Sequence, residues 1–148
     1  MADVRATQTL LALVRRTERM MVSELIGRLQ AAGYREISGA HHPLFENIDP
    51  GGTRLTVLAE RAGTTHQSMG ELVQSLERRG YVERRRDPTD ARARLVCLTP
   101  AGRKLVRRAL LEMVRIESRW GAAWREAGFD GQMRSILSAA LAAREGAG

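Results

Sequence analysis

The stretch from residue 55 to residue 98 decides the fold, and it reads LTVLAERAGTTHQSMGELVQSLERRGYVERRRDPTDARARLVCL. Thr56 is expected to cap a short helix, which ends near Gly63. Thr65 is then expected to cap a second helix that runs to about Arg79. The side chains expected to be buried on this second helix share a helical spacing: Met69, Leu72, Val73 and Leu76. Two short helices joined by a glycine-containing turn predict a helix-turn-helix.

An arginine-rich hairpin is expected after the second helix, which Gly80 ends. Residues 81–86 and 93–98 have the character of two strands, and the sequence between them, Asp87-Pro88-Thr89-Asp90, favours a turn. From Arg78 to Arg94 there are seven arginines and three acids, so this segment supplies +4 of the net charge of +7. This concentration of positive charge favours a polyanionic partner, above all DNA.

The residues expected to contact DNA lie in the second helix and in the hairpin. The N-terminal part of such a helix meets base edges in the major groove, where Gln, Ser, Thr and His side chains form hydrogen bonds. The helix residues predicted to do so are Thr65, His66, Gln67, Ser68 and Gln74. In the hairpin, four arginines are predicted to contact phosphates: Arg84, Arg85, Arg86 and Arg94. Arg92 is predicted to enter the minor groove, and Asp90 to pair with a neighbouring guanidinium and hold the hairpin tip.

Long helices are expected on both sides of this DNA-binding part, which covers about residues 53–99. Apolar residues keep a helical period over residues 6–32, and again in a helix that Thr99 caps and Gly128 ends. A last helix follows, and three aromatic residues near it are expected in a dimer core: Trp120, Trp124 and Phe129. The first helix is longer than a small domain needs for its own core. We therefore expect it to pack against a second subunit, and Leu25→Asp to weaken that association.

These motifs resemble those of MarR-type (multiple antibiotic resistance regulator) transcription regulators. The resemblance rests on the sequences of residues 55–63, 76–82, 83–92 and 98–102, and the Asp and Arg of the family's wing signature fall on Asp90 and Arg92. It implies a mainly α-helical winged helix-turn-helix with a small β wing, as a single unit over residues 1–148. The dimerisation helices would cover about residues 6–33 and 100–145. The function implied is a homodimer on a palindromic operator in double-stranded DNA, acting as a repressor that a small aromatic or other effector releases.

The chain departs from the pattern of the family at Gly70 and Glu71, where polar or basic residues are usual. An acid there would repel a phosphate, so Glu71 is expected to meet a cytosine amine, to pair with an arginine or to point away. Gly70 costs roughly 1 kcal/mol inside a helix compared with Ala. Either close approach of the backbone to DNA or close packing against the preceding helix would explain it.

By analogy with the family, an effector pocket is expected to involve Tyr34, His41, His42 and Phe45. The adjacent histidines raise the question of metal binding. A structural zinc site needs four well-placed ligands, and no cysteine or histidine follows in the C-terminal helices. Packing or surface histidines are therefore the expectation, and neither a metal nor a cofactor is predicted.

Composition narrows the other classes of function. The chain has 148 residues, of which 43% are hydrophobic and 28% charged, as in a globular protein. Its one cysteine, Cys97, is expected to be a small buried side chain rather than a redox sensor. A single cysteine is consistent with a reducing cytoplasm. The apolar run at residues 10–14 is too short to span a membrane.

An enzyme is not expected. Asp87 and Asp90 lie among arginines that keep both ionised, and no nucleophile–base set is apparent. The main alternative is a non-specific architectural DNA-binding protein, for which the basic region offers a single aromatic residue, Tyr81. A protein that binds acidic partners through its basic face is a further alternative.

Overall fold

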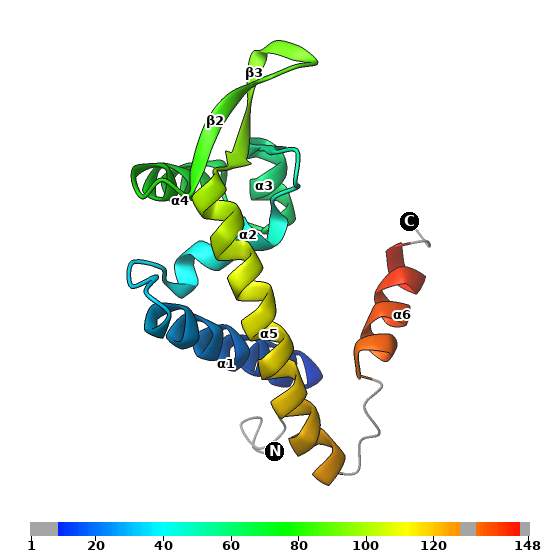
Figure 1. Cartoon of the computed structure of the whole chain (residues 1–148). Coiled ribbons are helices and arrows are strands. Elements are labelled where there is room, and N and C mark those ends of the chain that lie inside the picture. Colours follow the sequence, from blue (N-terminus) through cyan, green and yellow to red (C-terminus); the bar gives the residue numbers. More distant parts are fainter. Residues whose placement is uncertain (1–8, 128–132, 146–148) are drawn as a thin grey trace, which may run out of the picture. The chain divides into compact units, whose positions relative to one another are not determined.

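The computed structural model describes residues 9–127 and 133–145 (Figure 1). Two compact units divide the chain, the first ending at Glu112 and the second beginning at Met113. The elements of the first unit, in chain order, are the helix α1 (Leu10–Ala31), the 3₁₀ turn η1 (Gly39–His41), the helix α2 (His42–Asn47), the strand β1 (Thr53–Arg54), the helices α3 (Leu55–Arg61) and α4 (His66–Arg78), and the strands β2 (Val82–Asp87) and β3 (Asp90–Leu98). The helix α5 (Pro100–Glu126) runs from the first unit into the second, which also holds α6 (Met133–Glu145).

The helix-turn-helix predicted from the sequence is present as α3 and α4. Thr65 caps α4 because its Oγ1 accepts a hydrogen bond of 3.0 Å from the amide of Ser68. At the other end, Gly80 has a φ of +75°, and the amide of Tyr81 donates to the carbonyl of Leu76. Such a left-handed residue lets the chain turn sharply from helix to strand, and glycine adopts it without strain.

The start of α3 differs from the prediction. Arg54, not Thr56, is the N-cap residue, and Thr56 lies inside the helix. The two residues before α3 form the strand β1, in which Thr53 pairs with Val96 and Arg54 with Leu95. This third strand is not predicted from the sequence, because two residues are too few to show an alternating pattern. Before β1, the segment after Ser38 forms two elements, η1 and then α2, with Pro43 in the first turn of α2.

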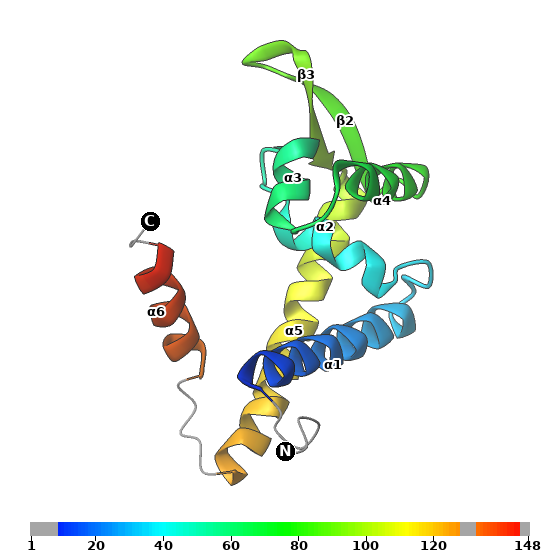
Figure 2. The ribbon, with the colours of Figure 1, turned by 180° about the vertical axis from the view of Figure 1, so that it is seen from behind.

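The sheet has the order β1-β3-β2, and all of its strand pairs are antiparallel. The predicted hairpin is confirmed as β2 and β3, whose register runs from Val82 opposite Leu98 to Arg86 opposite Arg94. An irregularity follows at Asp87, which pairs with Asp90 across the turn. The hairpin projects beyond α3 and α4 in both ribbon views (Figures 1 and 2).

The first unit contains an apolar core of its own. The predicted inner face of α4 is confirmed, since Met69, Val73 and Leu76 are fully buried and Leu72 is half-buried. Other buried side chains come from every layer of the unit: Leu25, Leu29, Ile37, Leu44, Leu58, Val82, Val96, Leu98 and Leu105. Leu25 is thus part of the core of its own chain, so Leu25→Asp would disrupt folding and is not a clean test of association.

The start of α5 is held tightly against Tyr81, the residue before β2. Thr99 caps it as predicted, since its Oγ1 accepts from the amide of Gly102 at 3.1 Å. The amide of Thr99 also donates to the carbonyl of Tyr81. A Cβ on Gly102 would lie 2.0 Å from that carbonyl oxygen, so only glycine fits at this position.

The second unit consists of the later part of α5 and of α6. Trp120 and Trp124 meet edge to face with ring centroids 6.2 Å apart, and Arg134 forms an ion pair with Glu117. Gly128 and Phe129 lie outside the described residues. No helix in the described part of the chain has the length and the apolar character needed to cross a membrane.

Candidate DNA-binding site

The exposed face of α4 is polar throughout. The five residues predicted to contact bases are all exposed: Thr65, His66, Gln67, Ser68 and Gln74. Burial of Met69, Val73 and Leu76 turns the opposite side of the helix into the core, and so fixes which side faces outward. The structure therefore leaves all five residues accessible.

Three of these side chains are already ordered by hydrogen bonds at the start of α4. The Thr65 hydroxyl donates to Ser68 Oγ at 2.8 Å, so the two hydroxyls lie side by side at the start of the helix. From the same first turn, Gln67 Nε2 donates to Oε1 of Glu71, one turn further along the helix, at 3.3 Å. Gly70 lies between them, and a Cβ there would meet only Leu55 Cδ2 at 3.8 Å, an ordinary contact. Close packing against α3 therefore does not explain the glycine.

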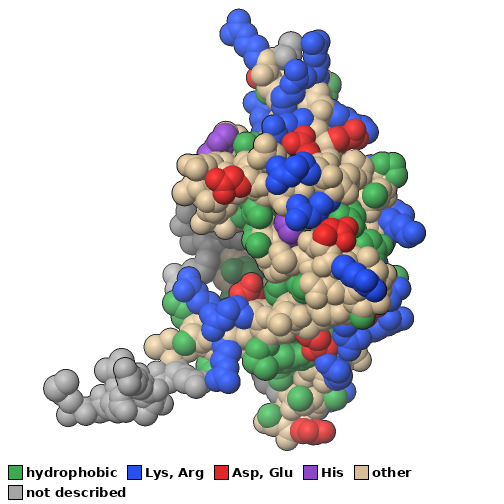
Figure 3. Space-filling view, turned by 90° about the vertical axis from the view of Figure 1, so that its left-hand side faces the viewer, with side chains coloured by type: hydrophobic (Ala, Val, Ile, Leu, Met, Phe, Trp, Pro, Cys, Tyr) green, Lys and Arg blue, Asp and Glu red, His purple; other side chains and the backbone are tan. Residues whose placement is uncertain are grey.

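The register of the hairpin places three arginines on one face. Residues that pair across antiparallel strands share a face, as do residues two apart along a strand. Arg86 lies opposite Arg94, and Arg84 lies two residues before Arg86. Arg92 lies nearby, in the irregular stretch of β3 between Asp90 and Arg94. All four are exposed. Figure 3 shows cationic side chains gathered over the projecting end of the molecule that the hairpin forms.

The arginines of the hairpin differ in their partners. Arg85 donates to Glu83 on its own strand at 2.5 Å, and Arg84 lies 3.6 Å from Glu77 of α4. In the described part of the chain, no acid pairs with the side chains of Arg86, Arg92 or Arg94. Like charges directly opposite on neighbouring strands destabilise a sheet, so the pair Arg86–Arg94 is unfavourable without an anion.

A buried carboxylate fixes the end of the hairpin. Asp87 is only 7% exposed; its Oδ1 accepts from the amide and the hydroxyl of Thr89, and its Oδ2 accepts from Arg54 at 2.6 and 2.8 Å. These hydrogen bonds, first those from Thr89 and then that from Arg54, lower the pKa of Asp87 to about 2. The same contact raises the pKa of Arg54.

Asp90 completes this arrangement. Its Oδ2 lies 3.5 Å from Arg54, and its Oδ1 accepts from the backbone amide of Arg92 at 3.0 Å. The expectation that Asp90 pairs with a guanidinium is met by Arg54. Arg54 is not predicted from the sequence, because it precedes Asp87 by 33 residues and no local pattern joins the two.

The four residues expected to form an effector pocket make separate contacts in the structure. His41 is buried, and its Nδ1 accepts from the amide of Ser38 at 3.1 Å. Its Nε2 lies 3.2 Å from the hydroxyl of Ser75 on α4. Burial, and after it the positive charge of Arg79, lowers the pKa of His41. His41 therefore joins the segment before α2 to α4 as a neutral imidazole.

The other three residues make different contacts. The ring of Tyr34 lies 6.4 Å from that of Tyr81, whose hydroxyl donates to Glu36 at 2.6 Å. Burial, followed by this hydrogen bond, raises the pKa of Tyr81 to about 12. His42 lies 3.7 Å from Glu46, and Phe45 is half-buried.

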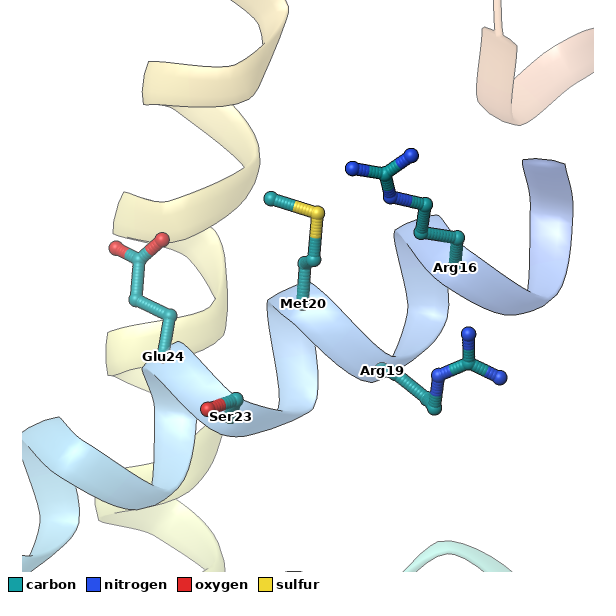
Figure 4. A pocket seen from close by; sticks show the side chains of 5 residues that line it. All are labelled: Arg16, Arg19, Met20, Ser23 and Glu24. Atoms are coloured by element: carbon teal, nitrogen blue, oxygen red, sulfur yellow. The ribbon is translucent and has the colours of Figure 1, made fainter.

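Neither of the two surface hollows that we describe is lined by these four residues. The larger one, of about 390 Å³, lies along α1 (Figure 4) and is lined by Arg16, Arg19, Met20, Ser23 and Glu24. Within residues 9–127 and 133–145, no three His, Cys, Asp or Glu side chains gather closely enough to hold a metal ion. Cys97 is a buried free thiol, as expected from its place on a strand.

Three comparisons with known proteins agree with this architecture. Residues 36–93 match the model of the MarR family. The transcriptional regulator HosA of Escherichia coli O111:H- is 37% identical over 62 residues, which are 42% of this chain and 46% of HosA. The match thus spans about half the length of that relative.

Solved structures extend the likeness to nearly the whole chain. The structure of S. aureus MepR in complex with DNA has a TM-score of 0.65 at 22% identity, covering 91% of this chain and 98% of that one. Streptomyces coelicolor PcaV in complex with its natural ligand has a TM-score of 0.59 at 26% identity, covering 95% and 99%. The fold is that of a winged helix-turn-helix protein. More particularly, residues 36–93 of the chain match the MarR family.

Proposed function

We propose that the chain is a sequence-specific, dimeric DNA-binding transcription regulator of the cytoplasm, a repressor that a small-molecule effector releases. The observation that carries this proposal is a single unit with two surfaces suited to DNA. The exposed face of α4 offers hydrogen-bonding side chains for base edges, and the hairpin offers four exposed arginines for phosphates or a minor groove. A phosphate near Arg86 and Arg94 would relieve the repulsion between them.

Exposed apolar side chains support a dimer. In the first unit, Leu10 and Leu11 of α1 are 77% and 65% exposed, and Leu110 and Leu111 of α5 are also exposed. In the second unit, Leu141 of α6 is exposed, with three others: Val114, Ile136 and Leu137. Surfaces of this kind favour association in water. A two-fold dimer would read a palindromic operator with half-sites about 10 base pairs apart.

The names of the matched proteins support the regulatory part of the proposal. HosA is named as a transcriptional regulator, and PcaV is a regulator whose structure holds its natural ligand. We carry both properties to this chain as proposals. The residues proposed to take part in effector binding remain Tyr34, His41, His42 and Phe45, from which His41 reaches α4 directly through Ser75. An occupant that moved His41 would therefore act on the helix that reads DNA.

Fluorescence anisotropy with labelled duplexes tests the central claim. Duplexes from the region around the protein's own gene would be titrated beside scrambled duplexes at two salt concentrations. A sequence-specific regulator should prefer one natural duplex by a factor of about 10³ or more. Arg92→Ala should weaken that binding, whereas Arg35→Ala, which removes the same charge from the loop after α1, should have little effect.

Two results would contradict the proposal. Equal and strongly salt-dependent binding to every duplex, extended to a pool of random sequences, would indicate an architectural DNA-binding protein. No binding even at low salt would indicate a protein that uses its basic face on acidic partners. Light scattering in the same buffers would report whether the binding species is a dimer.

A further inference from the structure

Glu71 is an acid on the surface of α4 that is proposed to face DNA. Its side chain is exposed, and it lies one helical turn after Gln67. Over the described residues, no arginine or lysine lies within ion-pair distance of Glu71. Its carboxylate instead accepts a hydrogen bond of 3.3 Å from Gln67 Nε2. The expectation that it pairs with an arginine is therefore not met.

This hydrogen bond orients the amide of Gln67. Glutamine reads adenine by accepting from the base N6 amine through its carbonyl oxygen and donating to N7 through its amide nitrogen. Nε2 carries two hydrogens, of which Glu71 takes one. The carbonyl oxygen and the second hydrogen remain available together, and the two ends of the amide cannot exchange places without breaking the bond to Glu71.

A carboxylate on this face also acts on DNA of every sequence. It repels phosphates, so it weakens binding wherever no base compensates for it. At a matching site, the oriented Gln67 amide gains its pair of hydrogen bonds. The same side chain therefore lowers affinity for unrelated DNA and raises discrimination between sequences.

We propose that Glu71 is a positioning residue that determines base preference through Gln67 and disfavours unrelated DNA. The inference rests on the proposed function, since it applies to a protein that reads DNA with α4. It yields an unusual pair of effects, because removal of the charge should improve binding to most DNA while degrading selectivity.

Selection from a pool of random duplexes tests this directly. Wild-type protein and the variants Glu71→Gln and Gln67→Ala would each be incubated with the pool, and the bound fraction sequenced. Glu71→Gln should bind random duplex about three- to tenfold more tightly at low salt. Its preference at one position of each half-site should fall by about tenfold, within the range of one bidentate base contact. Gln67→Ala should lose preference at the same position.

The matched control is Glu46→Gln, which removes the same charge from an exposed residue of α2. It should leave base preference unchanged. Gln has nearly the helix propensity of Glu, so Glu71→Gln should keep the fold, and circular dichroism would verify this. Glu71→Ala provides a second variant with the same expected loss of preference.

The outcomes separate this inference from the proposed function. If the wild-type protein enriches no motif, the proposed function fails and takes the inference with it. If the wild type enriches a motif and both Glu71 variants enrich it equally well, the function stands and the inference is overturned. A loss of preference at a position different from the one that Gln67→Ala affects would also overturn it.

Discussion

The winged-helix body, residues 25–105, and the first half of α1, residues 10–20, use their apolar side chains in opposite ways. In the body, apolar residues from helices and strands meet one another, and Leu44, Leu58, Met69 and Leu76 are fully buried. In the first half of α1, Leu10, Leu11, Leu13, Val14 and Met20 are all exposed. The two regions are both rich in apolar residues and differ in what covers them.

This difference separates what one chain can complete from what needs a second copy. Hydrophobic burial is the dominant favourable contribution to folding and to most association. The body gains it from its own chain, so its stability should not depend on protein concentration. We propose that the first half of α1 gains it from another copy of the chain. Substitutions in the two regions should therefore differ in kind as well as in size.

The largest expected contrast is between Leu25→Asp and Leu11→Asp. Leu25 is 5% exposed, so an aspartate there opens a cavity and buries a carboxylate. Each effect costs several kcal/mol, and we expect a loss of about 4 kcal/mol or more in the free energy of unfolding. Leu11 is 65% exposed, so Leu11→Asp should leave the fold of the single chain intact and abolish association.

Urea denaturation with light scattering at several protein concentrations distinguishes the two. Leu25→Asp should unfold at low urea at every concentration, whereas Leu11→Asp should give a folded particle with the mass of one chain. A Leu11→Asp protein that stayed dimeric at micromolar concentration would contradict the view that this half of α1 awaits a partner. Arg15→Asp, a neighbouring exposed position, controls for the introduced charge.

The next largest contrast is between two glycines that lie inside helices. In the body, a Cβ at Gly102 would lie 2.0 Å from the Tyr81 carbonyl oxygen, so α5 would have to move away from the sheet. Gly102→Ala should therefore lose about 3 kcal/mol of unfolding free energy. Gly27 of α1 also lies within residues 25–105, but a Cβ there meets nothing within 4 Å, so Gly27→Ala should gain up to about 1 kcal/mol. Urea denaturation reports both, and equal effects would contradict the assigned close approach.

How well the sequence predicts a structural feature depends on how far apart along the chain the residues that determine it lie. The caps Thr65 and Thr99 and the stop at Gly80 act within a few residues, and the structure confirms all three. Arg54 was missed because its partner Asp87 is 33 residues away. Leu25 was assigned to a dimer contact because helical spacing defines an apolar face without telling which part of it the same chain covers.

The pH dependence of stability gives a smaller contrast within the body. The amide of Ser38 donates to Nδ1 of His41, so the folded state holds the imidazole neutral, and its pKa lies below the ordinary 6.5. The unfolded chain binds the proton more readily. Stability should therefore be full above pH 6.5 and fall as the pH drops below it. The urea midpoint of the wild type should decrease between pH 7.5 and pH 5.5.

His41→Gln should remove most of this decrease, at the cost of a lower midpoint at pH 7.5. His42→Gln is the matched control, because His42 is less buried and its one acidic neighbour, Glu46, is 65% exposed. An undiminished pH dependence in His41→Gln would show that another group is responsible.

The smallest effect is expected from Gly70→Ala, which tests both the stability of α4 and DNA binding. Since a Cβ there would touch only Leu55 at an ordinary distance, alanine should stabilise α4 by about 1 kcal/mol, as it should α1 at Gly27. If the backbone of α4 approaches DNA closely at Gly70, the added methyl group should weaken binding to the selected duplex while the protein becomes more stable. Gly27→Ala should gain stability without that loss. Anisotropy and urea denaturation on the same two variants therefore distinguish a glycine that DNA binding requires from one that only lies in open space. Unchanged DNA binding by Gly70→Ala would show that DNA binding does not require Gly70.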